Sequence, residues 1–233
     1  MAEHLPFDEE EFSGELPLFP LPGVVLLPGG LLSLHVFEPR YREMVKAAAE
    51  GENLIGIATL GPDYESYDGP NPPIHPMVCL GRLTRDHELP DGRRLITVHG
   101  LRRVRINDED QSRSYRVAEV EIVPDTSGTL GLELRRLRNL IAGLAVRTPG
   151  LSETRDDDFE RLLASDEETL PTARFVDIIA AVAPLDTIER LAVMSGTTVC
   201  ERAHIVLEAL VRIIQEREPR GLRRLLLSAP SRN

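Results

Sequence analysis

The sequence predicts an α+β protein with a β-rich N-terminal part and a helical C-terminal part. Up to about residue 125, apolar residues alternate with polar ones or form short runs between Pro- and Gly-rich turns, which is typical of strands. From Gly131 onwards the apolar spacing changes to three or four residues, which is typical of helices packed on a core. We therefore divide the chain into an acidic tail (1–14), a β-rich domain (15–125) and a helical bundle (126–233).

The β-rich domain begins with short elements separated by turns. Residues 15–21 are expected to be extended, because a residue that precedes proline is driven out of the helical region. A second β-prone run covers 24–27, and residues 31–37 alternate as a half-buried strand. A helix is expected at 39–50, where proline at the first helical position sacrifices no hydrogen bond and Gly51 ends the helix.

The middle of this domain reads as one buried strand followed by a long loop. Residues 53–60 are almost entirely apolar, which predicts a strand covered on both faces. Residues 61–76 are rich in Pro, Gly and Asp and are expected to be a connection between strands.

A β-hairpin and one further strand complete the sheet. Strands at 77–87 and 94–106 flank Asp91-Gly92, a pair that tolerates the positive φ of a tight turn. Gly100, inside the second strand, indicates a bulge or sharp bend. Residues 115–123 alternate and end at a proline. The prediction for this part is five to seven strands and one helix.

Helices account for the remainder of the chain. They are expected at 131 to about 148, 156–164, 175–182, 185–194 and about 198–215, with Pro184 and Gly196 marking two of the breaks.

Charge and composition exclude several functional classes. The net charge is −11, and residues 1–125 contain 22 acidic and 12 basic side chains, so a large basic face for nucleic acid is not expected. The acidic N-terminus does not resemble a signal peptide and no apolar run has the length of a membrane span, which predicts a cytoplasmic protein with no membrane partner. Cys79 and Cys200 lack the spacing of a zinc site, and no metal or cofactor is expected.

The residues needed for several kinds of catalysis are missing from the sequence. Lys46 is the only lysine, and it lies within a predicted helix rather than in the glycine-rich loop of an ATPase P-loop. A Ser–Lys pair would also have to use Lys46. The histidines occur singly. Cys79 together with His87 or His99 across the hairpin leaves one alternative open, a cysteine-dependent hydrolase of unknown substrate.

Three segments together resemble the substrate-binding domain of Lon-family proteases. Residues 15–44 have the order strand, Pro-Gly turn, strand and F-x-x-R-Y helix start. The L-P-D-G turn at 89–92 precedes a strand, 96–106, whose glycine and arginines follow in the family's order. Residues 177–185, DIIAAVAPL, are similar to the family's helix-break segment. The resemblance covers about 15–217, and it is closest to stand-alone bacterial members without ATPase and protease domains.

The resemblance implies a PUA-like barrel followed by a helical bundle, and a non-catalytic module that binds unfolded or exposed polypeptide segments. A separate protease or chaperone is a candidate partner. A PUA-like RNA binder, which the charge disfavours, and a small-ligand binder remain as alternatives. Some candidate contact residues are apolar residues near turns, expected to line a groove between barrel and helices, and others match the family's strand motif: Phe19, Leu27, Phe37, Tyr41, Leu101 and Arg103.

Overall fold

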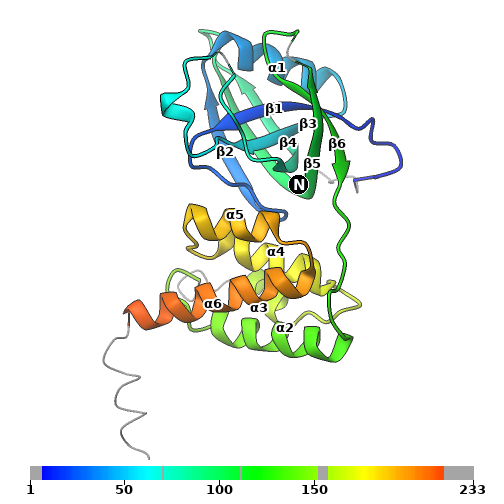
Figure 1. The fold of residues 1–233 in the computed structure, drawn as a ribbon, viewed down its shortest axis with the longest axis vertical. Helices are drawn as coiled ribbons and strands as arrows, with labels where there is room; N and C mark the ends of the chain where they lie inside the picture. Colours follow the sequence, from blue (N-terminus) through cyan, green and yellow to red (C-terminus); the bar gives the residue numbers. More distant parts are fainter. Residues whose placement is uncertain (1–6, 70, 111, 152–156, 218–233) are drawn as a thin grey trace, which may run out of the picture. The chain divides into compact units, whose positions relative to one another are not determined.

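The computed structural model describes residues 7–69, 71–110, 112–151 and 157–217. The chain is α+β and forms two compact units, Met1–Pro124 and Asp125–Asn233 (Figure 1). The first unit contains β1 (Glu15–Leu21), β2 (Leu31–Val36), α1 (Pro39–Glu50), β3 (Leu54–Thr59), the 3₁₀ turn η1 (Tyr64–Ser66), β4 (Met77–Glu88), β5 (Arg94–Asp110) and β6 (Val117–Ile122). The second contains α2 (Gly131–Ala145), α3 (Asp157–Ala164), α4 (Thr172–Val182), α5 (Thr187–Ser195) and α6 (Val199–Arg217).

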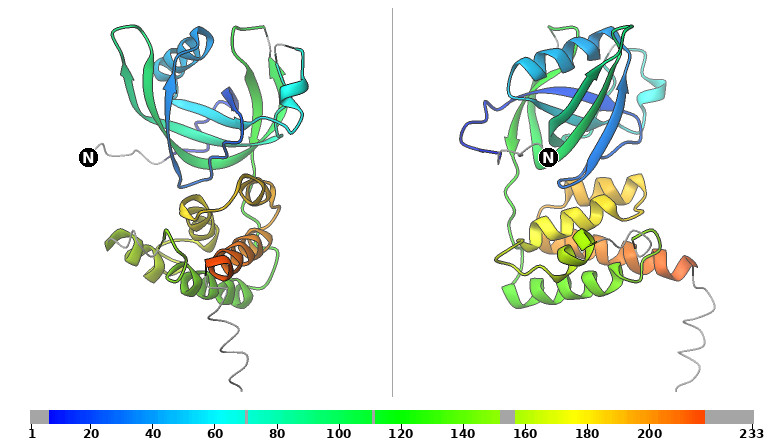
Figure 2. Two further views of the ribbon diagram at one scale, coloured as in Figure 1. Left: turned by 90° about the vertical axis from the view of Figure 1, so that its left-hand side faces the viewer. Right: turned by 180° about the vertical axis from the view of Figure 1, so that it is seen from behind.

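The six strands form one sheet in the order β2-β5-β4-β3-β1-β6, in which only β1 and β3 are parallel. β6 also pairs with β5, so hydrogen bonding runs from β5 through β4, β3, β1 and β6 and returns to β5. The strands curve around a common interior, and α1 lies across one end of them (Figure 2). The apolar interior contains Leu16, Leu18, Leu54, Ala58, Val78, Leu80, Leu101, Val104, Ala118 and Val120.

One long strand, β5, organises the edges of this sheet. β4 pairs with β5 from Arg94 to Arg105, and therefore occupies one edge of it. β2 and β6 share the other edge, β2 opposite residues 94–99 and β6 opposite residues 104–110. The outer edge of β6 is taken by β1, whereas no strand among the described residues pairs with the outer edge of β2.

Most of the predicted elements are present within a few residues of the expected bounds, and the main difference is the run Val24–Leu27. It forms no strand. Val25, Leu26 and Leu27 are nevertheless buried, so the apolar run reports burial of an irregular segment rather than strand pairing. Such short apolar runs do not distinguish these two outcomes by pattern alone.

Gly100 allows this irregular segment to lie directly against β5. Its N–H donates to the carbonyl of Gly30 and its carbonyl accepts from the N–H of Gly29, at 2.9 and 2.8 Å. The pairing of β4 with β5 shifts here, because Leu80 lies opposite Arg102 and the next residue lies opposite Gly100. The predicted bulge is thereby confirmed, and Leu101 is the extra residue.

Replacing Gly100 by alanine is expected to destabilise the first unit by about 1–3 kcal/mol, because backbone must move to accept the methyl group. A Cβ at this position would lie 2.3 Å from the carbonyl oxygen of Leu27. All four tyrosines lie in the first unit and the chain has no tryptophan, so tyrosine fluorescence during urea unfolding reports this unit. Gly143→Ala on α2, where a Cβ meets nothing within 4 Å, is the control and should leave the tyrosine transition unchanged.

The acidic N-terminal segment contacts the sheet rather than extending freely from it. Phe7 and Phe12 pack against the apolar interior, with their rings 6.0 Å apart. Glu9 accepts a hydrogen bond from Arg102 of β5. The described part of the segment, residues 7–14, therefore belongs to the first unit, which the acidic run alone did not indicate.

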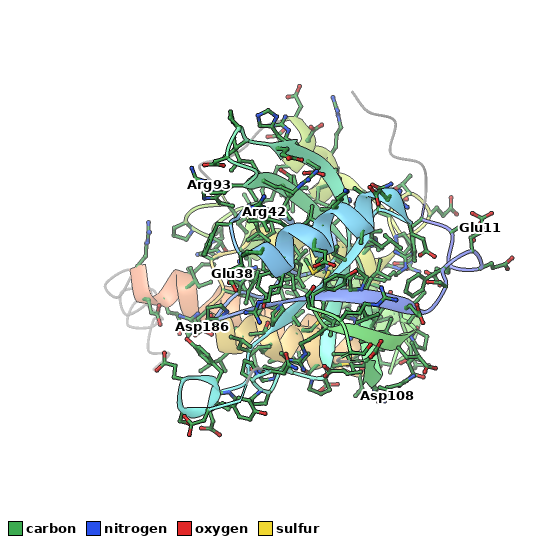
Figure 3. The ribbon with its side chains drawn as sticks, turned by 90° about the horizontal axis from the view of Figure 1, so that it is seen from above. Glu11, Glu38, Arg42, Arg93, Asp108 and Asp186 are labelled. Carbon is green, nitrogen blue, oxygen red and sulfur yellow. The ribbon has the colours of Figure 1, made fainter. Side chains whose placement is uncertain are left out.

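Two arginines next to the hairpin turn, Arg93 and Arg94, are paired with carboxylates. Arg94 binds Asp86 and Glu88 at 2.7–2.8 Å. In the turn, Asp91 accepts the backbone N–H of Arg93, which lowers the pKa of the Asp91 carboxyl, and Gly92 has a φ of +79°. Figure 3 looks down onto α1, with Arg42 on the side that carries the hairpin residue Arg93.

In the second unit, α6 packs against α2, α4 and α5, and α2 packs against α4. Buried apolar side chains fill the space between them: Leu137, Ile141, Phe175, Val176, Ile179, Val193, Met194, Ala203, Val206, Leu210 and Ile214. Arg202 of α6 is fully buried among these helices and pairs with Asp125 at 2.7 Å and Asp177 at 3.0 Å. Its Nη1 has no hydrogen-bond partner in the described part of the chain.

Candidate functional site: an aromatic pocket beside the free edge of β2

A pocket of about 370 Å³ lies between the end of β1, the end of β2 and the start of α1, all within the first unit. Its size falls within the usual range for ligand sites. The lining is mostly apolar and comes from five places in the sequence: residues 19–22, 34–38 together with 40–41, Leu60, 71–72 and 114–116.

Two buried rings form the floor of the pocket. Phe19 of β1 and Tyr41 of α1 lie with their ring centroids 4.6 Å apart and their planes tilted by 31°. Such offset contacts between rings add to the free energy gained from burial alone. Burial raises the pKa of the Tyr41 phenol, so this hydroxyl remains neutral at physiological pH.

Arg116 holds one wall of the pocket in place. Its Nε and Nη2 donate to the two oxygens of Glu109 at 2.7 and 2.8 Å, and its Nη1 donates to the carbonyl of Pro72 at 2.7 Å. A bidentate pair of this kind fixes orientation as well as position. The loop that carries Pro72 is thereby attached to β5 and to the residue that precedes β6.

The rim carries one exposed ring and one ion pair. Phe37 is 61% exposed, although it is a large apolar residue, and its ring centroid lies 6.2 Å from that of His35. Glu38, which lies at the N-terminal end of α1 in Figure 3, binds Arg40 at 2.9 Å. The Arg40 guanidinium also lies 4.5 Å from the centre of the Tyr41 ring. The pocket therefore offers aromatic contact area with its nearest charges already paired.

The family model for the ATP-dependent protease La (LON) substrate-binding domain matches residues 15–212 of this chain. The chain belongs to the Lon substrate-binding domain family. This domain is the non-catalytic part of Lon proteases, and the match covers neither the ATPase nor the protease domain.

Two solved structures share the fold, and curated relatives match in sequence. The Lon N-terminal domain protein of Xanthomonas campestris is 23% identical with a TM-score of 0.58, covering 83% of this chain and 97% of that one. The N-terminal domain of the Mycobacterium avium complex Lon protease is 16% identical with a TM-score of 0.63, covering 84% and 98%. Lon protease 2 of Herpetosiphon aurantiacus is 28% identical over 190 residues, which are 81% of this chain and 22% of that protein. The chain thus spans less than a quarter of that relative's length.

Three of the six contact residues predicted for this Lon domain lie together in the pocket, and three do not. Phe19 and Tyr41 form its floor, and Phe37 lies at its rim. The other three are buried and do not line the pocket: Leu27, Leu101 and Arg103, which are 0%, 8% and 2% exposed. Leu101 points into the sheet interior because it is the bulge residue, and Arg103 lies opposite Cys79 on β4.

The remaining lining residues were not identified from the sequence. Tyr115 and Arg116 precede β6, and Asn71 and Pro72 belong to the loop expected to be a simple connection. Tyr64, Tyr67 and the repeated prolines of that loop are an unusual composition for a bare connection, and this composition is the signal that could have identified it.

The geometry around Cys79 does not support the cysteine-dependent hydrolase. Its side chain is 0% exposed and its Sγ donates to the carbonyl of Leu80 at 3.6 Å. Across the hairpin, His99 lies opposite Arg82, three residues along β4 from Cys79, and His87 lies opposite Leu95. The Cys79 Sγ lies on the face of β5 where a Cβ at Gly100 would be 3.0 Å from it. Successive side chains of a strand point to opposite faces, so the neighbouring His99 is directed away from this sulfur.

Thiol labelling checks this directly. In the native protein, we expect an aromatic disulfide reagent to react with Cys200, which is partly exposed, and not with Cys79. Burial raises the pKa of the Cys200 thiol, so even this reaction should accelerate as the pH rises above neutral. Cys200→Ser should abolish labelling until the protein is unfolded. Rapid labelling of native Cys79 would restore the hydrolase as a candidate.

Within the described residues, no three or more His, Cys, Asp or Glu side chains gather closely enough to hold a metal ion. The helices described here also include none with the length and apolar character of a membrane span.

Proposed function

We propose that this Lon substrate-binding domain binds unfolded or exposed polypeptide segments in the aromatic pocket and does not cleave them. The observation that carries the proposal is the exposed Phe37 at the rim of a pocket with Phe19 and Tyr41 at its floor. Exposed aromatic side chains beside a concave apolar surface are typical of protein-binding sites. Family membership supports a polypeptide ligand.

We also propose that the closed circuit of strand pairing is the expected PUA-like barrel, and that the helices of the second unit form the expected helical bundle.

A binding assay with a permanently unfolded protein tests this proposal. Reduced, carboxymethylated α-lactalbumin carrying a fluorescent label should bind, whereas native α-lactalbumin should not, because only the unfolded form exposes apolar segments. The same mixtures, with ATP and Mg²⁺ added, should show neither cleavage of the unfolded protein nor release of phosphate. Equal affinity for the folded and unfolded forms would contradict the proposal, and so would cleavage that is lost on Cys79→Ser.

A small ligand is the second candidate, and the volume of the pocket is the observation that favours it. About 370 Å³ is enough for a drug-sized molecule, and Tyr41, Tyr115 and Arg116 supply polar groups in the lining. In this case, a compound that raises the thermal stability of the first unit should compete with unfolded α-lactalbumin. A compound that stabilises the protein without competing would show that the small ligand and the polypeptide bind at different sites.

A further inference from the structure

The pocket adjoins the outer edge of β2, where backbone N–H and C=O groups are not used in strand pairing. From the bond between the Gly100 N–H and the Gly30 carbonyl, alternation along the antiparallel pair makes Leu32, Leu34 and Val36 the residues that bond to β5. The backbone N–H and C=O groups of the intervening residues, Leu31, Ser33 and His35, therefore point to the outer edge. No described strand pairs with that edge.

Nothing in the sequence of β2 protects this edge. Natural edge strands commonly carry a lysine, a proline or a bulge that prevents pairing with another chain. β2 has the sequence LLSLHV, which contains neither lysine nor proline, and its unbroken register with β5 shows no bulge. Leu31 is 70% exposed. Such an edge is suited to the addition of a further strand.

The sheet topology shows where this added strand would lie. β6 and β2 follow one another along the same edge of β5, and β1 occupies the outer edge of β6 only with its first residues, Glu15–Pro17. Beside β2, the corresponding position holds the pocket, which is lined by Leu34, His35 and Val36 on one side and by the end of β1 on the other.

Charge favours a basic occupant. The two arginines in the pocket lining are already paired, Arg40 with Glu38 and Arg116 with Glu109. The loop that supplies Asn71 and Pro72 to the lining also carries three exposed carboxylates, Asp63, Glu65 and Asp68, for which the structure gives no cationic partner among the described residues.

We propose that an extended, lysine- or arginine-bearing polypeptide segment adds as a strand to the outer edge of β2 and places one apolar side chain in the aromatic pocket. This inference rests on the proposed function and specifies how the ligand is held. Backbone hydrogen bonds from Leu31, Ser33 and His35 supply affinity that does not depend on ligand sequence. The pocket and the loop carboxylates select an apolar side chain flanked by positive charge.

Amide hydrogen exchange with unfolded α-lactalbumin bound is the first test. In the free protein, the amides of Leu31, Ser33 and His35 should exchange fast, while those of Leu32, Leu34 and Val36 are protected by β5. Binding should slow the first three by at least about tenfold. If binding occurs without this protection, strand addition is wrong and the proposed function stands. If no binding occurs, both fail.

A second test uses a twelve-residue peptide that alternates valine with threonine, has one central phenylalanine and ends in lysines. Two N-methylated versions are compared, one methylated at odd and one at even positions. In an added strand, only alternate N–H groups face β2, so one version should lose at least about tenfold in affinity while the other binds nearly as the parent. Equal loss or equal retention in the two versions would overturn strand addition.

The charge preference has its own control. Replacing the terminal lysines of the peptide by glutamates should weaken binding to the wild-type protein. In a variant with Asp63→Asn, Glu65→Gln and Asp68→Asn, all at exposed positions, the preference for the lysine peptide should shrink. An unchanged preference in this variant would rule out the loop as the source of the selectivity.

Discussion

Replacing Arg202 by alanine is expected to lower the free energy of unfolding of the second unit by about 3–5 kcal/mol. The guanidinium is fully buried and bonds to Asp177, whose side chain is itself only 4% exposed. Removing one partner of a buried ion pair leaves the other charge without compensation, and this costs more than the pair itself contributes. Urea unfolding followed by circular dichroism at 222 nm measures this loss of stability, because the helices of the second unit dominate that signal.

Arg212→Ala on the same helix is the matched control. Arg212 is partly exposed and pairs with Glu189 and Glu216 near the surface, so its loss should cost less than about 1 kcal/mol. A double variant, Arg202→Met with Asp177→Leu, removes both buried charges and should recover part of the lost stability. Equal destabilisation by Arg202→Ala and Arg212→Ala would show that breaking the buried ion pair costs no more stability than breaking the surface pair.

Replacing Phe37 by alanine is expected to weaken binding of unfolded α-lactalbumin by about 2 kcal/mol or more, which is roughly a 30-fold rise in Kd. The ring is mostly exposed in the free domain, so binding would bury apolar surface that the fold itself does not use. For the same reason the substitution should leave the tyrosine unfolding transition almost unchanged. Fluorescence anisotropy gives the affinity, and urea titration gives the stability.

Ile188→Ala provides the comparison for Phe37→Ala. Ile188 is 78% exposed on α5, so this variant removes a large exposed apolar side chain from the other unit. It should bind the unfolded protein as the wild type does. If the two variants weaken binding equally, apolar surface in general attracts the ligand, and the pocket is not the site.

Local patterns in the sequence predicted most of the secondary structure because each signal acts over a few residues. The start of α1 at Pro39 follows from proline chemistry, and the hairpin turn follows from Asp91-Gly92, whose glycine has a positive φ. Tyr41 and Met44, three residues apart along α1, both lie on its buried face, as helical periodicity requires. The run at 24–27 was misread because its burial depends on Gly100, more than seventy residues away.

The candidate site was only partly predictable, since it depends on strand register. Phe19, Phe37 and Tyr41 could be selected as apolar residues near turns, and the pocket contains all three. Leu27 was selected in the same way and Leu101 from the family's strand motif, yet their positions opposite Gly100 and at the bulge bury them. Neither the pairing of β6 with both β1 and β5 nor the resulting free edge of β2 can be read from local pattern.

The most direct test of polypeptide binding at the pocket is a paramagnetic footprint on the wild-type protein. Unfolded α-lactalbumin carrying a single nitroxide is added to the ¹⁵N-labelled protein, and the loss of each amide signal is recorded. We expect the strongest broadening at pocket-lining residues, above all His35, Phe37 and Tyr115. Broadening confined to the helices of the second unit, or spread evenly over both units, would contradict a binding site at the pocket.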